Sequence, residues 1–357
     1  MPFSTEQKLV IGVSSRALFA LEAANRIFEN DGLQAYQDFQ RKNLSRPLEP
    51  GPVFRFISEL LAFNRALPDI EPIEVVLLSK NDPITGDRIF HSIEHHGLAI
   101  SRAVFTSGRS LHHYLDAFDV ALYLSADAGH VAAARAEGWP AGCVQHHGSE
   151  WSMADGEIRI AFDFDGVLAS DESQRVFERF GLETFHTHEV THRARPLDAG
   201  PLHRLLHKLG ELQSLLQRAR IDRPRLRISI VTSRSAPATR RLIRTLDAWG
   251  IVPDDAFFLG GLEKRRVLKT LRPHIFFDDQ HEHLQDVFAA VHIPPVAQAV
   301  ETGADVDAAQ PSGPELKSPR RVERSGAASS ENQSESSERS IIASAGGTKR
   351  LASNDTP

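Results

Sequence analysis

Two carboxylates stand two residues apart at the end of an apolar run: Asp163 and Asp165 follow Ile160-Ala161-Phe162. Such a run predicts a buried parallel strand, and ligands of open α/β sheets bind beyond the carboxyl ends of the strands. Burying two acids there without a partner would be costly. Mg²⁺, which proteins usually hold with one or two carboxylates and a substrate phosphate, removes that cost. The pattern therefore predicts a phosphate site.

Two further apolar runs, over residues 228–231 and 275–277, also end in polar side chains, and a lysine lies between them. In chain order these polar residues are Thr232, Ser233, Arg234, Lys264, Asp278 and Asp279. Each piece alone has a simpler explanation as a helix cap, a turn or a loop. Their shared position after successive strands favours one catalytic site.

Three of the candidates have a chemical task in phosphoryl transfer. Asp163 is the predicted nucleophile, which attacks phosphorus to form an aspartyl-phosphate. Asp165 is the predicted general acid, which protonates the leaving oxygen and later activates water as a base. Lys264 would balance the negative charge on the nucleophile and the phosphate.

The candidates are also predicted to bind substrate and metal. Thr232, Ser233 and Arg234 would hold the phosphoryl group of the substrate. The predicted Mg²⁺ ligands are Asp163, Asp165, Asp278 and Asp279, the last of which would bind the ion directly or through water.

These motifs resemble those of the haloacid dehalogenase (HAD) superfamily of phosphotransferases, and the chain more closely resembles the cytosolic 5'-nucleotidase type I family. The closer resemblance spans roughly residues 8–300 and includes the segments 13–19, 122–127, 170–173 and 272–280, several of which lie outside the superfamily motifs. It implies an HAD-like parallel sheet and Mg²⁺-dependent hydrolysis of nucleoside 5'-monophosphates, AMP first among them. It also implies regulation by an adenine-nucleotide effector. Phe164 departs from the glycine of animal members.

The chain contains an internal repeat. Residues 26–33 match residues 175–182 at an offset of 149, and from Ser79, which matches Thr232, the offset is 153. The first copy lacks the charged catalytic groups: Ser14 and Arg16 stand for Asp163 and Asp165, Leu111 for Lys264, and Ser125-Ala126 for Asp278-Asp279. We therefore expect residues 1–150 to form a degenerate, non-catalytic HAD-like unit and residues 151–301 to form the catalytic domain.

Two roles are open for the first unit. It would either pack on the catalytic half and stabilise it, or bind an effector through Arg16, Ser79 and Lys80 at strand ends. Cationic and hydroxyl side chains of this kind bind phosphate without a metal.

Residues from about 170 to about 225 form a predicted helical insert, with leucines at three and four spacing between Leu202 and Leu216. An insert at this point of the superfamily is usually a cap that excludes water and contacts the leaving group. Its residues 188–192 also match the H-E-x-x-H pattern of zinc proteases. Because no third ligand is spaced nearby, we favour the cap.

Composition fits an intracellular enzyme of small substrates. The 357 residues, 41% of them hydrophobic, can bury two cores. Cys143, the single cysteine, suits a reducing compartment, and we expect a cytoplasmic protein because no run is long and apolar enough for a membrane span. A net charge of −6 offers no attraction to a nucleic-acid polymer. Residues 302–357, rich in Ser, Glu, Ala and Gly, are a predicted disordered tail.

Together these features predict an α/β 5'-nucleotidase that uses Mg²⁺. A phosphatase for another small phosphoester, such as a sugar phosphate, is the alternative, because the catalytic motifs do not determine which leaving group the site accepts. A nucleotide-binding protein without turnover is disfavoured by the presence of both acids. The sequence leaves the oligomeric state open, a homo-oligomer included.

Overall fold

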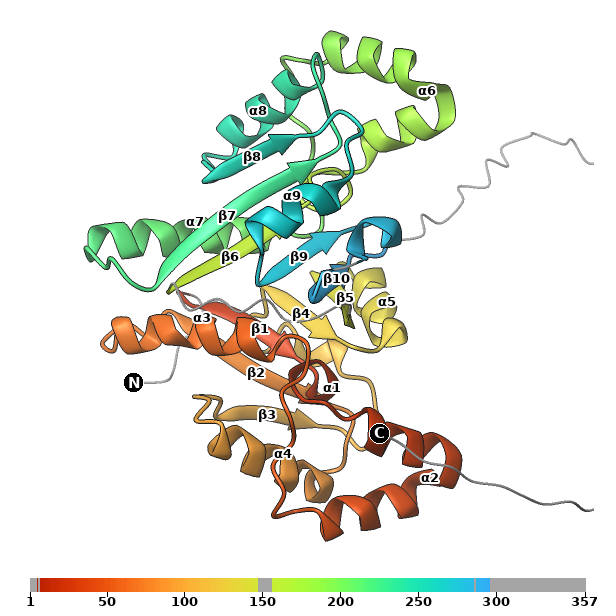
Figure 1. Cartoon of the computed structure of the whole chain (residues 1–357), viewed down its shortest axis with the longest axis vertical. Helices are drawn as coiled ribbons and strands as arrows, with labels where there is room; N and C mark the ends of the chain where they lie inside the picture. Colours follow the sequence, from red (N-terminus) through yellow and green to blue (C-terminus); the bar gives the residue numbers. More distant parts are fainter. Residues whose placement is uncertain (1–4, 6, 147–155, 286, 296–357) are drawn as a thin grey trace, which may run out of the picture. The chain divides into compact units, whose positions relative to one another are not determined.

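The computed structural model describes residues 5, 7–146, 156–285 and 287–295. Its first five strands are β1 (Leu9–Val13), β2 (Ile73–Ser79), β3 (Arg102–Phe105), β4 (Leu122–Ser125) and β5 (Ala141–His146). The next five are β6 (Glu157–Phe162), β7 (Arg225–Thr232), β8 (Asp255–Phe258), β9 (Ile275–Asp278) and β10 (Ala289–His292). All ten form one sheet in the order β3-β2-β1-β4-β5-β10-β9-β6-β7-β8 (Figure 1).

Strand pairing divides this sheet into two sets. Within β1–β5 and within β6–β10 every pair is parallel. The two sets join where β5 pairs antiparallel with β10, with Ala289 opposite His146 and His292 opposite Cys143. The predicted α/β class with a mostly parallel sheet is therefore confirmed. Because the sets run in opposite directions, their carboxyl ends face opposite edges of the sheet.

Helices connect the strands in both sets. The first set carries α1 (Ser15–Leu18), α2 (Glu22–Lys42), α3 (Phe54–Ala66), α4 (Pro83–His95), the 3₁₀ turn η1 (His112–Tyr114) and α5 (Ala128–Ala136). The second carries α6 (Glu172–Thr191), α7 (His203–Arg218), α8 (Thr239–Ala248), α9 (Lys264–Leu271) and the 3₁₀ turn η2 (His281–Leu284). Both α2 and α6 bend at a glycine with positive φ, Gly32 (83°) and Gly181 (79°), a conformation that glycine adopts without strain.

The two helices of the predicted insert over residues 170–225 have different roles. The apolar stripe of α7 is buried in the main core together with strand residues such as Ile158 and Ile160 of β6. This burial is what an amphipathic helix achieves by packing on a sheet. The predicted cap function can therefore apply to α6 and not to α7.

Two predicted features fall outside the described residues: the domain boundary near residue 150 and the tail over residues 302–357. None of the described helices is long and apolar enough to cross a membrane.

Candidate active site

A buried lysine joins two buried acids at the carboxyl ends of β6 and β9. Asp163 directly follows β6, Asp278 ends the neighbouring strand β9, and Lys264 begins α9. The ammonium Nζ of Lys264 lies 2.9 Å from Oδ1 of Asp163 and 2.7 Å from Oδ2 of Asp278. The sheet brings the acids together because adjacent parallel strands end at the same edge.

A third acid completes the cluster. Carboxylate oxygens of Asp163, Asp278 and Asp279 all lie within 4.8 Å of one another. Oδ1 of Asp279 is buried and has no hydrogen-bond partner among the described residues. Gly166 has a φ of 71°, and a Cβ there would lie 2.6 Å from Oδ2 of Asp279, so the close turn after Asp165 needs a glycine. Three grouped acids, two of which pair with the same lysine, fit a hard divalent cation.

The pKa values in the cluster show how its charge is distributed. Burial raises the pKa of Asp163 to about 7, against the opposing effect of Lys264. Burial, reinforced by repulsion from Asp163 and Asp278, raises the pKa of Asp279 to about 8. Burial acts in the same direction on Asp278, but Lys264 and His283 outweigh it, so the pKa of Asp278 is lowered. In the absence of a cation, the cluster therefore tends to keep protons on Asp163 and Asp279.

Asp165 lies apart from this cluster, because its carboxylate is bound by Arg234. Nε of Arg234 donates to Oδ2 of Asp165 and Nη2 donates to Oδ1, each at 2.7 Å. The third nitrogen of Arg234 pairs with Glu189 of α6 and donates to the carbonyl of Ala238. The structure thus does not bring the carboxylate of Asp165 to the other predicted metal ligands. The guanidinium of Arg234, which the sequence predicted to contact the phosphate, is instead bound to Asp165 and Glu189.

Glu189 belongs to the H-E-x-x-H segment, and both oxygens of its carboxylate have partners within the protein. It is buried, accepts a hydrogen bond from Oγ of Ser173 at 2.7 Å and from Nη1 of Arg241 at 2.9 Å, and pairs with Arg234. Among the described residues, the groups that could hold a metal do not include this segment. The match to the zinc-protease pattern is therefore explained by a buried ion network.

A cavity of about 850 Å³ reaches the cluster at Asp163 and Lys264, whereas Asp278 and Asp279 are not among the residues that line it. Asp163, Asp165, Thr232, Ser233, Arg234 and Lys264 all line it, so the structure brings these predicted site residues to one cavity. Oγ1 of Thr232 accepts a hydrogen bond from the backbone N–H of Arg234 at 3.2 Å, which closes the turn after β7.

The opposite wall of the cavity comes from α6. It includes Gln174, Phe177, Leu182, Phe185 and His186. The rings of Phe177 and Phe185 meet edge to face, with centroids 6.1 Å apart and planes at 81°. Sequence reasoning did not assign these residues to the site. The signal was present, because residues 175–182 are the segment that repeats.

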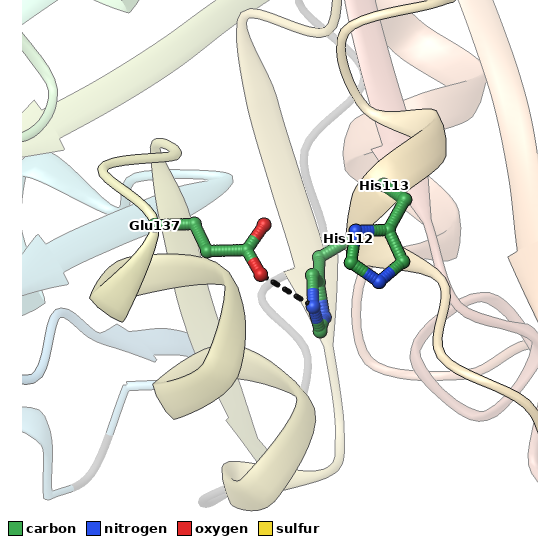
Figure 2. Close-up of side chains that lie close together, drawn as sticks. All are labelled: His112, His113 and Glu137. Atoms are coloured by element: carbon green, nitrogen blue, oxygen red, sulfur yellow. Dashed lines mark ion pairs between the residues drawn. The ribbon is translucent and has the colours of Figure 1, made fainter.

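A second group with potential metal ligands lies outside this cavity. His112, His113 and Glu137 place their ligand atoms within 4.8 Å of one another (Figure 2). Nε2 of His112 lies 2.7 Å from Oε1 of Glu137, and Oγ of Ser110 lies 2.8 Å from its Nδ1. Both ring nitrogens of His112 therefore have partners, and His113 and Glu137 are exposed. We assign no metal to this group.

Comparison with known proteins places the chain in a family. Residues 1–302 match the family model described as 5'-nucleotidase. Over 292 residues the chain is 36% identical to cytosolic 5'-nucleotidase 1B of Homo sapiens. The aligned segment covers 80% of this chain and 48% of the human protein. The chain thus spans about half the length of this curated relative. No solved structure matches it. Since the family model covers most of its length, the chain belongs to the 5'-nucleotidase family.

Proposed function

We propose that this protein hydrolyses nucleoside 5'-monophosphates, AMP preferentially, to nucleoside and phosphate in the cytoplasm. The observation that carries the proposal is the buried cluster of three acids and Lys264, of which Asp163 and Lys264 line a cavity with an aromatic wall. The family and the name of the human relative support the same activity and compartment. An aromatic wall suits the flat base of a nucleoside.

The proposed cofactor is Mg²⁺, held by Asp163, Asp278 and Asp279. The fit rests on their grouped oxygens and on the unpaired buried oxygen of Asp279. When bound, Mg²⁺ supplies positive charge that offsets the charges of these acids and of the substrate phosphate. Lys264 adds a fixed positive charge beside the nucleophile.

The chain's own groups account for both steps of the proposed reaction. A carboxylate oxygen of Asp163 forms a bond to phosphorus as the bond from phosphorus to the ester oxygen breaks, and Asp165 gives that oxygen a proton. Water then attacks the aspartyl-phosphate and gives its proton to Asp165, which releases phosphate and restores Asp163. Thr232 and Ser233 hold phosphoryl oxygens throughout.

We further propose that the two halves are copies of one HAD-like unit. The strand order supports this, because β3-β2-β1-β4-β5 mirrors β8-β7-β6-β9-β10 about the β5–β10 pair. Equivalent hydrogen bonds also recur at the offsets of the repeat. Nη1 of Arg88 donates to Gln40 at 3.0 Å, and in the second half Nη1 of Arg241 donates to Glu189 at 2.9 Å. Likewise, Oγ of Ser92 accepts from the N–H of Leu48, and in the second half Oγ1 of Thr245 accepts from the N–H of Leu197.

One detail of the repeat alignment needs correction. The N–H of Gly51 donates to the carbonyl of Leu18, and the N–H of Gly200 donates to that of Leu168. The donors Gly51 and Gly200 keep the offset of 149, whereas the acceptors Leu18 and Leu168 are 150 residues apart. The second copy thus has an extra residue shortly after Asp163, so Arg16 does not stand opposite Asp165 as the sequence alignment predicts.

Phosphate release tests the proposed activity. The substrates are AMP, dAMP, IMP, GMP, CMP, UMP and sugar phosphates, each assayed with Mg²⁺ and with EDTA for the wild type and Asp163→Asn. Release from nucleotides that requires Mg²⁺ and is lost in the variant is the expected result. Release only from sugar phosphates would show a different substrate class. Release from no substrate would show a binding protein.

A further inference from the structure

A second cavity, of about 630 Å³, lies beyond the carboxyl ends of β1, β2 and β4. None of the residues that line it lines the cavity over Asp163. Its size is within the usual range for small-molecule sites. Because the two strand sets run in opposite directions, the two cavities open at opposite edges of the sheet.

Helix α2 gives this second cavity the same wall that α6 gives the first. Phe28 and Tyr36 meet edge to face, with centroids 6.0 Å apart and planes at 80°. These values are within 0.1 Å and 1° of those for Phe177 and Phe185, the residues at the repeat offset of 149. The remaining α2 residues that line it, Asn25, Leu33 and Gln37, stand at the same offset from Gln174, Leu182 and His186 of the first wall.

The floor keeps its backbone arrangement and loses its acids. Oγ of Ser79 accepts from the N–H of Asn81 at 3.2 Å, as Thr232 does from Arg234. Oγ of Ser125 accepts from the N–H of Asp127 at 3.1 Å, as Asp278 does from Gln280. Ser14 stands in place of the nucleophile Asp163. The metal-holding groups found among the described residues include no residue of this cavity.

Two cations remain in the second cavity. Arg16 and Lys80 line it, and no ion pair of either is found among the described residues. Nε of Arg16 is buried without a hydrogen-bond partner. The two acids of the cavity have other partners, because Asp82 accepts from the first N–H groups of α4 and Asp127 from the N–H of His130 in α5. Against the effect of burial, Lys80 still attracts Asp127 and helps lower the pKa of that carboxyl, but neither Arg16 nor Lys80 forms a close ion pair with a described acid. The cavity thus offers a guanidinium and an ammonium near hydroxyls, which suits a phosphate.

We propose that the second cavity binds a nucleoside phosphate intact and without a metal. Arg16 and Lys80 hold the phosphate, and Phe28 and Tyr36 contact the nucleoside. Ser14 stands where the first cavity has its nucleophile, and the carboxylates of Asp82 and Asp127 are held by helix N–H groups, so the bound ester is not cleaved. The nucleoside part rests on the proposed function, because it is argued from the likeness of the two walls, whereas the phosphate part rests on the cations.

Calorimetric titration of the full chain tests this site. AMP and, separately, inorganic phosphate are titrated in EDTA into Asp163→Asn protein, alone or with Arg16→Gln, Phe28→Ala or Phe177→Ala added. We expect an AMP site that is weakened at least about tenfold by Arg16→Gln and by Phe28→Ala, because each removes a direct contact. Phe177→Ala, the matched change in the first cavity, should alter the Kd less than about twofold. Phosphate should bind more weakly than AMP.

Three results would overturn the proposal: no AMP binding in EDTA, AMP binding sensitive to Phe177→Ala and not to Arg16→Gln, or phosphate binding as tight as that of AMP. Thermal unfolding shows whether each variant is folded. If Arg16→Gln is not, Lys80→Gln removes the other cation and should weaken AMP in the same way. The outcome is independent of catalysis. Failure of wild-type protein to release phosphate from AMP would reject the proposed function while leaving an Arg16-dependent site intact.

Discussion

Arg234 binds Asp165 through two hydrogen bonds of equal length, Nε to Oδ2 and Nη2 to Oδ1, both at 2.7 Å. Its remaining nitrogen pairs with the buried Glu189 of α6. The predicted general acid is therefore tied through one arginine to the helix that forms the aromatic wall. The position of α6 and the orientation of Asp165 are coupled by this arrangement.

Replacing Arg234 with Asn should destabilise the protein by about 3 kcal/mol, because it leaves the acids Asp165 and Glu189 without their shared cation. The first half of the chain has the neutral residues Asn81 and Gln40 at the matching positions. The double variant Arg234→Asn/Glu189→Gln recreates that pair and should cost less than the sum of the single changes, by about 1 kcal/mol or more. Urea unfolding measures all four proteins, and additive costs would show that the two residues are not coupled.

Asp165→Asn should lower kcat for AMP by about 10²- to 10⁴-fold, the usual contribution of a general acid or base. KM should change little, because Asn keeps the size of the side chain and one oxygen for Arg234. Steady-state kinetics separates the two constants. As a control, Asp247→Asn changes an exposed aspartate and should leave both constants unaffected. A full-rate Asp165→Asn enzyme would remove Asp165 from the proposed chemistry.

Mg²⁺ affinity should fall as the pH is lowered from about 8.5 to about 6. In the metal-free protein the pKa of Asp163 is about 7 and that of Asp279 about 8, so both acids take up protons over this range. Protons and Mg²⁺ then compete for the same oxygens, and each displaced proton weakens binding by up to about tenfold per pH unit. Calorimetry in buffers of different ionisation enthalpy measures the protons released.

The control for this experiment is Asp279→Asn, which removes the more strongly shifted of these two acids. Its Mg²⁺ affinity should be lower and should depend less on pH. An affinity that is flat with pH in the wild type would contradict the proposed ligands. Chelation with EDTA should abolish phosphate release, and added Mg²⁺ should restore it.

Phe177→Ala should raise KM for AMP by about tenfold, because the loss of an aromatic contact with a base typically costs about 1–3 kcal/mol. Product inhibition by inorganic phosphate, which has no base, should stay unchanged. Phe180→Ala is the matched control, since Phe180 lies on the same helix and is similarly exposed, 57% against 47% for Phe177, but does not line the cavity. Equal effects of the two variants would show a general disturbance of α6.

Local patterns in the sequence determined which residues could do chemistry. Apolar runs that end in acids or hydroxyls predicted the strands and the edge where Asp163, Thr232 and Asp278 lie, because a buried strand and its polar end are both set by adjacent residues. The spacing of the leucines correctly predicted the buried face of α7. Periodicity alone does not indicate which surface that face packs against. Only packing showed that, of these two helices, α7 covers the sheet and α6 lines the cavity.

The charge partners were decided by the tertiary structure. The residues around Arg234 do not indicate whether its side chain binds a phosphate or pairs with Asp165. Its other partner, Glu189, lies 45 residues away along the chain. The sequence by itself determined the α/β class and the candidate groups. Their pairing depends on distances between segments remote in sequence, and a carboxylate or guanidinium binds whichever opposite charge the fold brings within reach.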